Sequence, residues 1–273
     1  MTAASAVKTV GVIGAGRMGQ PIIGHMARRG LTVIAHDIDE QKRGAVEKLG
    51  AGWAATPAVL AERCEAILVC VGYDRELREL MDALLGILPR GTIVAVLSTV
   101  HPRTIRELAA AAKPYGVDLV DTTVARGGRA ADAGTLLAFI GGDEAVVARL
   151  TPVLSCFSAD IAHVGGVGAA QVAKAANNLV MWACLIADHE ALALSTRFGI
   201  DVDRLRQALL ISSADNYVLR HWGENTMAWA EDDMEIVQQM AHEAGIGLPQ
   251  AGLNRELCRT LKPKRFKLDE YGV

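Results

Sequence analysis

Aromatic side chains are scarce in this 273-residue chain, and its cysteines and histidines form no recognisable cluster. Phenylalanine, tryptophan and tyrosine together make up 4% of the residues. The cysteines are odd in number and widely spaced, and no pair has the spacing of a metal site or a redox motif. We therefore expect no metal site, and we expect structural roles for the cysteines and for His36, His163, His189 and His221.

A concentrated basic face is also missing. The formal net charge is −3 and the isoelectric point is about 6.2, which argues against nucleic acid or an anionic membrane as a partner. The one basic cluster, residues 262–267, contains Pro263, and we interpret it as a solvated tail. Residues 1–7 lack the basic and apolar regions of a signal peptide, so we expect a cytoplasmic protein.

Only one apolar stretch is long enough to span a bilayer, and it is interrupted by polar side chains. From Val164 to Ala187, Lys174 is the only charged residue, and the length suffices for a membrane helix. Gln171, Asn177 and Asn178 lie in the same stretch and argue against contact with lipid. We expect a helix buried on most sides inside a protein core.

The first half of the chain alternates short apolar runs with amphipathic stretches. The runs are apolar throughout, which is typical of strands in a parallel sheet covered on both faces. The stretches between them have helical periodicity, so the pattern predicts a doubly wound α/β domain of the Rossmann type. The predicted strands are 7–13, 31–36, 66–71, 92–97, 117–120, 136–140 and 161–164, and the predicted helices are 17–29, 40–49, 75–88 and 102–113.

After Gly168 the strand-like runs disappear, and residues 169–261 have the pattern of helices. Gly199, Gly223, Gly245 and Pro249 mark the breaks. We therefore predict a dinucleotide-binding domain over residues 1–164 and an all-helical domain over residues 165–273.

A glycine-rich loop joins the first predicted strand to the first predicted helix. Gly14, Gly16 and Gly19 form the pattern G-x-G-x-x-G, whose glycines allow a tight turn, close approach of a pyrophosphate and close packing of the helix on the sheet. The pyrophosphate would lie at the positive end of the helix, beside Arg17 and Met18. This context predicts a dinucleotide site.

Asp37 ends the second predicted strand, 23 residues after Gly14. A carboxylate at this place accepts hydrogen bonds from the adenosine ribose and repels a 2′-phosphate. Asp39 and Glu40 add negative charge, whereas Lys42 and Arg43 are opposing cations that we expect to face solvent. The pattern favours NAD over NADP.

Lys174 is the only charged residue in a long apolar helix, with Asn177 and Asn178 on the same face. Burial of an unpartnered ammonium is costly. Partial burial and a nearby oxidised nicotinamide would favour the neutral amine, which could accept a hydroxyl proton as hydride leaves carbon. The alternative, a lysine that extends to a polar rim, stays open on these residues alone.

Several segments resemble the 3-hydroxyisobutyrate dehydrogenase (β-hydroxyacid dehydrogenase) family over nearly the whole chain. The lysine segment reads Gly165-x-x-Gly168-x5-Lys174-x-x-Asn177-Asn178. The glycine loop, the Ser98-Thr99-x-x-Pro102 segment, residues 121–142 and residues 229–249 are similar to the family's cofactor, nicotinamide, substrate and C-terminal segments, in that order.

This resemblance implies a Rossmann domain joined by a long helix to an all-α domain that forms dimers or tetramers. It implies Lys174 as general acid/base with Asn178 in support, and a small hydroxy acid or its carbonyl product as substrate. The implied substrate-binding residues are Thr123, Ala125, Arg126, Gly127 and Asn177, and the implied cofactor residues beyond the glycine loop and Asp37 are Val71, Gly72, Ser98, Thr99 and Asp232.

The chain departs from the family pattern at two places. Where the family has Ser-Gly-Gly in its substrate segment, this chain has Ala125-Arg126-Gly127. The hydroxyl that helps to hold a substrate carboxylate is lost, and Arg126 either supplies a bidentate clamp instead or points to solvent. Asp232 stands where the family has a lysine close to the cofactor, which removes a cation there.

The segment between Ser212 and Trp229 contains Asn216, Tyr217 and Trp222. In a chain so poor in aromatics, this clustering indicates either a pocket for a bulkier substrate or ordinary helix packing.

Three functions are compatible with these features. The first is a dehydrogenase of a small 3-hydroxy acid. The second is an imine reductase of the same architecture, against which Lys174 counts. The third is a non-catalytic dinucleotide-binding protein, for which Ala125 and Asp232 are the only supporting features.

Overall fold

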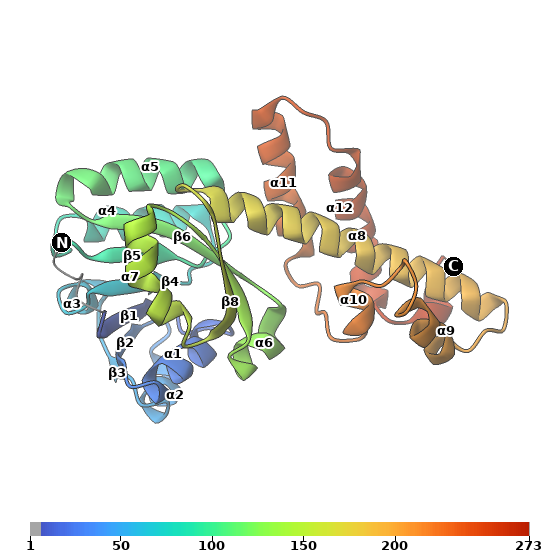
Figure 1. The fold of residues 1–273 in the computed structure, drawn as a ribbon, viewed down its shortest axis with the longest axis horizontal. Coiled ribbons are helices and arrows are strands. Elements are labelled where there is room, and N and C mark those ends of the chain that lie inside the picture. The colour runs from blue at the N-terminus through green and yellow to red at the C-terminus, as the bar shows by residue number, and fades with distance from the viewer. Residues whose placement is uncertain (1–6, 273) are drawn as a thin grey trace. The chain divides into compact units, whose positions relative to one another are not determined.

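The computed structural model describes residues 7–272, and the chain forms two compact units, one up to Lys174 and one from Ala175. The first unit is built on an eight-stranded sheet with the order β3-β2-β1-β4-β5-β6-β7-β8 (Figure 1). The strands are β1 (Thr9–Ile13), β2 (Thr32–His36), β3 (Gly52–Trp53), β4 (Ala66–Val69), β5 (Ile93–Val96), β6 (Asp118–Ala125), β7 (Leu136–Gly141) and β8 (Ser158–Gly165).

Helices cover both faces of this sheet, because its central strands are apolar on both sides. In β5, Ile93 and Ala95 pack into one hydrophobic core, and Val94 and Val96 into the other. The first core is closed by α1 (Gly19–Arg28), α2 (Arg43–Lys48), α6 (Gly127–Ala133) and α7 (Glu144–Leu154), and the second by α3 (Pro57–Ala61), α4 (Asp74–Leu84) and α5 (Pro102–Ala112). The doubly wound α/β class is confirmed.

The expectation of a wholly parallel sheet is wrong at one pair of strands. β7 runs antiparallel to β6, with Thr123 opposite Phe139, and β8 then runs parallel to β7. The short α6 between β6 and β7 gives the chain no crossover, so it returns beside the strand that it has just left. β6 also continues to Ala125, five residues beyond the predicted strand end at Val120.

Four elements escaped the sequence pattern: β3, α3, α6 and α7. β3 has only two residues, and α3 has five, which is too short for periodicity to register. α6 begins with two glycines, which are poor helix formers. α7 contains Pro152, a residue that usually ends helices.

The second unit is helical. Its core contains Trp182 and Leu185 from α8, Met234 from α11 and Cys258 from α12. The helices are α8 (Ala169–Arg197), which begins in the first unit, α9 (Val202–Leu209), α10 (Tyr217–Arg220), α11 (Ala230–Ala244) and α12 (Pro249–Leu261).

α8 is long and apolar enough to cross a membrane by length and composition alone, and 39% of its most apolar window is buried. The expectation that this helix is buried on most sides is therefore wrong for a single chain. Exposed apolar residues follow one another at helical spacing along the part of α8 in the second unit, namely Ala176, Val180, Ala187, Ala191 and Leu194, with Phe198 directly after the helix. We call these six residues the α8 stripe.

The interpretation of the basic segment 262–267 as a solvated tail is wrong. Lys262 pairs with Glu231 at 3.2 Å, and Lys267 pairs with Glu270 at 3.2 Å. The backbone N–H of Phe266 donates to Nε2 of buried His189 at 2.8 Å. The segment is thereby packed against the second unit, because Phe266 brings an apolar side chain into an otherwise charged sequence.

Candidate active site

The predicted cofactor residues of the first unit lie just beyond the ends of neighbouring parallel strands. β1, β2, β4 and β5 pair in parallel, so their carboxyl ends meet at one edge of the sheet, which is where ligands bind in doubly wound folds. The residues that follow these ends are Gly14 to Gly19, Asp37, Val71, Gly72, Ser98 and Thr99.

The glycine loop has the geometry that a pyrophosphate requires. Gly14 has a φ of +102°, and a Cβ there would lie 2.3 Å from the carbonyl oxygen of Cys70. A Cβ on Gly19 would lie 2.0 Å from the Gly14 oxygen, whereas one on Gly16 would meet nothing within 4 Å. Two glycines are thus needed for packing, and the third leaves open space beside the N-terminus of α1, which fits a dinucleotide phosphate.

Asp37 is buried and holds this loop. Its Oδ2 accepts from the N–H of Ala15 at 2.7 Å, and its Oδ1 accepts from the N–H of Asp39 at 2.9 Å. Burial by itself would raise the pKa of Asp37, but these amides and the nearby Lys42 outweigh burial and hold the pKa below its usual value.

Lys42 was predicted to face solvent, but it is paired with Asp37. Its Nζ lies 3.0 Å from both carboxylate oxygens of Asp37. The reason is local: Glu40–Lys42 forms a 3-10 turn before α2, which directs Lys42 back to the end of β2. Arg43 behaves as expected, pairing with Glu47 on an exposed helix surface.

Buried polar groups anchor the start of α8. Asp121 is fully buried on β6, and its carboxylate accepts from the N–H of Gly168 at 2.7 Å and of Gln171 at 3.0 Å. Burial raises the pKa of Asp121, although the amides act in the opposite direction. The Gln171 side chain donates to the Ser98 oxygen at 2.9 Å and accepts from the N–H of Val100 at 3.0 Å. The first turn of α8 is thereby fixed to β5 and β6.

Lys174 lies on the second turn of this anchored helix. Its half-buried Nζ donates to the carbonyl oxygen of Val124 at 2.8 Å, so the amine sits at the carboxyl end of β6. Asn177 and Asn178 follow on α8 and belong to the second unit, where the Asn177 amide donates to Asn178 Oδ1 at 3.0 Å. Asn178 is 2% exposed.

The predicted substrate segment surrounds the end of β6. The Thr123 hydroxyl donates to the oxygen of Ala170 at 2.9 Å, so this side chain holds α8. Ala125 is buried. Gly127 has a φ of +73° and begins α6.

Arg126 adopts a backbone conformation that side chains rarely take, with a φ of +81°. Its guanidinium pairs with Asp160 on β8 at 2.7 Å and donates to the Thr135 oxygen at 3.2 Å. Exposure to solvent alone, one of the two predicted states, does not describe this arrangement, and the clamp on a substrate carboxylate stays a prediction. The family has glycine at this position. The left-handed backbone that Arg126 adopts here accounts for that glycine, since glycine takes such a conformation without steric cost.

Asp121 and Gln171 are the site residues that sequence reasoning did not assign. A signal for Asp121 existed, since a single carboxylate inside an apolar strand is costly to bury without partners. Its partners are backbone amides 47 and 50 residues away, which no local pattern reveals.

In the second unit, Asp232 is exposed on α11, and its neighbour Asp233 accepts from the Trp182 indole at 3.0 Å. Within residues 7–272, no cluster of three or more His, Cys, Asp or Glu side chains could hold a metal ion.

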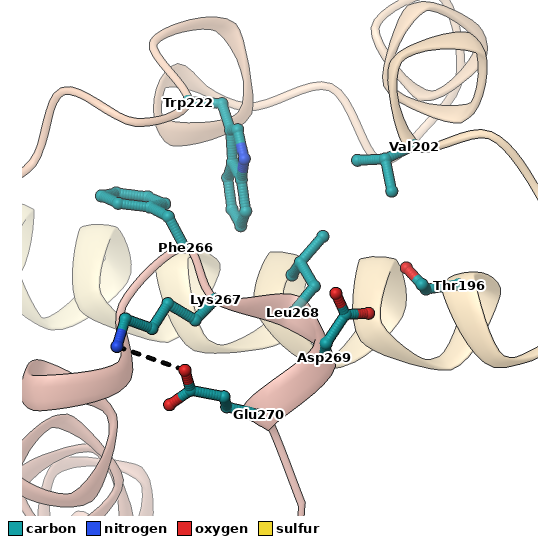
Figure 2. A pocket seen from close by; sticks show the side chains of 8 residues that line it. All are labelled: Thr196, Val202, Trp222, Phe266, Lys267, Leu268, Asp269 and Glu270. Atoms are coloured by element: carbon teal, nitrogen blue, oxygen red, sulfur yellow. Dashed lines mark ion pairs between the residues drawn. The ribbon is translucent and has the colours of Figure 1, made fainter.

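The aromatic segment predicted between Ser212 and Trp229 has a mixed role. Asn216 caps α10, and Tyr217 stacks on His221 with ring centroids 4.1 Å apart. Trp222 meets Phe266 edge to face at 5.0 Å and lines a cavity of about 520 Å³ in the second unit (Figure 2). Helix packing accounts for Asn216 and Tyr217, and a pocket for a bulkier substrate stays a prediction.

Known proteins are similar to this chain over most of its length. Residues 9–166 match the NAD-binding domain of 6-phosphogluconate dehydrogenase, and residues 168–270 match the NAD-binding region of NADP-dependent 3-hydroxyisobutyrate dehydrogenase. The chain is 32% identical to 2-(hydroxymethyl)glutarate dehydrogenase of Eubacterium barkeri, over 91% of this chain and 87% of that protein. It is 25% identical to the NAD-dependent L-serine dehydrogenase of Pseudomonas aeruginosa, over 98% and 96%.

Among solved structures, the 3-hydroxyisobutyrate dehydrogenase of Mycobacterium tuberculosis with L-serine superimposes with a TM-score of 0.87 at 21% identity, covering 94% of each chain. An imine reductase from Pseudomonas sp. has the same fold, with a TM-score of 0.67 at 15% identity and 94% coverage of each chain. The dehydrogenase is the more similar of these two structures.

Proposed function

We propose a reaction scheme and a substrate class from one premise: the chain belongs to the 3-hydroxyisobutyrate dehydrogenase family and is an NAD(P)-dependent dehydrogenase that acts on the CH–OH group of hydroxy acids. In this scheme Lys174 is the general acid/base. The observation that carries it is the position of Lys174 Nζ, 2.8 Å from the Val124 oxygen at the carboxyl end of β6.

The bound dinucleotide supplies the hydride acceptor. Lys174, as a neutral amine, takes the proton of the substrate hydroxyl while the carbon–oxygen bond becomes a carbonyl, and it returns that proton in the reverse direction. The Val124 oxygen orients the amine, and Asp121, Thr123 and Gln171 hold the start of α8 that carries it. We assign a supporting role to Asn178 on the next turn.

The proposed substrates carry a hydroxymethyl group on the carbon beside a carboxylate. This unit occurs in both 2-(hydroxymethyl)glutarate and L-serine, the compounds that the two relatives are named for. We propose that residues 123–127 and Asn177 bind the substrate. The Arg126 guanidinium already pairs with Asp160, so a substrate carboxylate would bind it beside that carboxylate or in its place.

For the cofactor, we propose NAD rather than NADP. The support is the Asp37 carboxylate, which is held charged at the end of β2. The Lys42 ammonium offsets part of that charge, and this lowers the discrimination that Asp37 alone would give. We assign the phosphates to Gly14, Gly16, Arg17, Met18 and Gly19, and the nicotinamide end to Val71, Gly72, Ser98, Thr99 and Asp232.

Three further assignments are part of the proposal. We place the boundary of the dinucleotide-binding domain between residues 164 and 165, before the start of α8, whereas the two compact units divide within α8 after Lys174. We also place the protein in the cytoplasm. We also propose a homodimer in which the α8 stripe is covered by a second copy, since an apolar row of this kind is unfavourable in water.

The direct test is turnover. NADH formation from NAD would be followed with 3-hydroxyisobutyrate, 3-hydroxypropionate, L-serine and 4-hydroxybutyrate. We expect turnover with at least one acid of the first three, and a loss of kcat/KM of about 100-fold or more in Lys174→Ala, the usual weight of a general acid/base, with NADH affinity unchanged.

Lys48→Ala, an exposed lysine of α2, is the matched control and should behave as the parent chain. Equal turnover by Lys174→Ala would refute the role of the lysine. Reduction of cyclic imines by the native chain without any hydroxy-acid turnover would favour the imine reductase alternative.

A further inference from the structure

Arg17 connects the glycine loop to the helix that follows the substrate segment. Its Nη1 donates to Asp132 Oδ1 at 2.7 Å, and its Nη2 donates to Asp132 Oδ2 at 2.6 Å. Two parallel bonds of this kind form the bidentate fork that gives an arginine–carboxylate pair its fixed geometry. Both side chains are more than half exposed, at 60% and 55%, so the pair by itself is worth little stability.

The same guanidinium lies directly over the first turn of α6. A Cβ on Gly128 would approach Arg17 Nη2 to 2.6 Å, which leaves room for glycine alone unless the arginine moves. α6 begins at Gly127, the last residue of the proposed substrate segment. Arg17 thus contacts both ends of α6, with Gly128 at its start and Asp132 near its end.

His25, on α1, makes a second link to the same helix. His25 Nε2 lies 3.1 Å from the Ala131 oxygen and 3.0 Å from the Asp132 oxygen, at the carboxyl end of α6. A Cβ on Gly134, the residue that ends α6, would meet the His25 ring at 2.7 Å. The glycine loop before α1 and the last turn of α1 thus both contact α6, and Asp132 takes part in both contacts.

We propose that Asp132 is a positioning residue that, through Arg17, couples dinucleotide binding to the order of residues 126–133. A pyrophosphate bound at the N-terminus of α1 would restrain the backbone of residues 16–18, because amide donors at a helix N-terminus bind such an anion. Holding that backbone restricts the Arg17 side chain, so less conformational entropy is lost when the fork to Asp132 closes. The fork then restrains α6 and, with it, Arg126 and Gly127. This coupling rests on the proposed function only for the substrate role of residues 126 and 127.

The coupling is reciprocal, as any linkage between two binding events must be. If NADH orders α6, then a substrate that requires an ordered α6 tightens NADH by the same factor. The factor expected from a single exposed bidentate pair is about threefold to fivefold. A purely structural ion pair predicts a factor of one.

The test is amide hydrogen exchange of residues 126–136 with and without saturating NADH. In the native chain we expect NADH to slow exchange in this segment by about threefold to fivefold. In Asp132→Asn we expect that slowing to disappear, with the Kd for NADH within about twofold of the native value. Asp132→Glu, which keeps the carboxylate, should restore part of the slowing of exchange by NADH.

Glu47→Gln is the matched control. It removes a carboxylate from the Arg43–Glu47 pair, which has a similar length of 2.8 Å and similar exposure of 61% and 48%, on another helix of the same unit. This variant should keep the full NADH effect. The same NADH effect in Asp132→Asn as in Glu47→Gln would overturn the proposal.

Kinetics give a second readout once a substrate is known. Asp132→Asn should raise the KM of the hydroxy acid about threefold to fivefold with little change in kcat, since saturating substrate can order α6 unaided. A fall in kcat with an unchanged KM would contradict this. A native chain without any hydroxy-acid turnover would defeat the proposed function, and the exchange experiment would still decide the coupling.

Discussion

At the scale of the residue, Asp37 combines two tasks. Its carboxylate holds the glycine loop through the N–H of Ala15, and it presents negative charge where the adenosine ribose of a dinucleotide would lie. Lys42 lies within 3.0 Å of both oxygens of that carboxylate. We therefore expect the choice between NAD and NADP to depend on this pair of opposite charges and not on one aspartate.

Asp37→Asn should shift cofactor preference toward NADP. The amide keeps one acceptor for the loop but loses the charge that repels a 2′-phosphate, and it releases Lys42 to bind that phosphate. We expect the ratio of kcat/KM for NAD to that for NADP to fall at least about tenfold. A factor of ten corresponds to a change of about 1.4 kcal/mol in the interaction between this site and the 2′-phosphate. Steady-state kinetics with both cofactors measures it.

The double variant Asp37→Asn/Lys42→Ala separates the two charges. It should lose most of the gain in kcat/KM for NADP, while its kcat/KM for NAD should stay at the value of the single variant. An unchanged cofactor ratio in the single variant would contradict the assignment of Asp37 to the ribose site.

At the scale of the element, α8 combines an anchored start with a buried histidine near its end. His189 is fully buried, and its ring packs against Trp222 at 4.5 Å and Phe266 at 5.2 Å. Its Nδ1 lies 2.8 Å from the Leu185 oxygen, and its Nε2 accepts from the N–H of Phe266. Only the neutral ring can donate at one nitrogen and accept at the other.

This arrangement makes the second unit sensitive to acid. Burial lowers the pKa of His189 in the folded chain, while the unfolded chain keeps a value near 6.5. The histidine's contribution to stability is therefore complete above about pH 6.5 and is lost as the pH falls below it, by up to about tenfold in the unfolding equilibrium for each pH unit.

Urea unfolding between pH 7.5 and 5, followed by far-ultraviolet circular dichroism, measures this loss. His189→Gln removes the titrating ring, so its midpoint should fall less over this range than that of the native chain. His221→Gln, a histidine of the same unit that is more exposed, should follow the native chain. Parallel pH dependence in all three proteins would rule out His189 as the source.

At the scale of the whole molecule, the α8 stripe is a row of apolar side chains that a single chain leaves exposed to water. Val180 is 63% exposed, Leu194 is 62% exposed and Phe198 is 78% exposed. These residues share one side of a helix whose other side packs in the core of the second unit. A second copy of the chain could bury the row, which is the basis of the proposed homodimer.

Light scattering should show a particle of about 58 kDa, twice the 29.0 kDa of one chain. Leu194→Glu should convert it to the monomer, because a charge in a buried apolar interface has no partner. Ile211→Glu is the control, since Ile211 is 90% exposed but lies outside α8. A native monomer, or a Leu194→Glu dimer of native stability, would refute the stripe as the interface.

Much of the fold could be predicted because its signals are local. Apolar runs of strand length, helical periodicity and the glycine loop each lie within about 20 residues, and the helical second unit was evident from the loss of strand-like runs after Gly168. The elements that were missed, β3, α3, α6 and α7, are short or contain residues that weaken local preference, such as Gly127, Gly128 and Pro152.

The candidate site divides in the same way. Gly14, Asp37 and Lys174 could be proposed as site residues because each stands out from its immediate neighbours: a tight turn, a strand end and an isolated charge in an apolar helix. For Lys174 the family resemblance was also needed, since its residues alone left a second reading open. The amino-acid sequence by itself determined the cofactor loop and the alternation of strand and helix, and its resemblance to a known family indicated the reaction class.

Only the tertiary structure decided which groups these residues meet. Asp121 accepts from amides at residues 168 and 171, Arg17 reaches Asp132 across 115 residues, and Arg126 pairs with Asp160 instead of standing open. Such partners are chosen by the packing of β6, α6 and α8 around one sheet. Hydrogen bonds and ion pairs depend on distances of about 3 Å, which are set when distant segments meet and which a linear pattern does not contain.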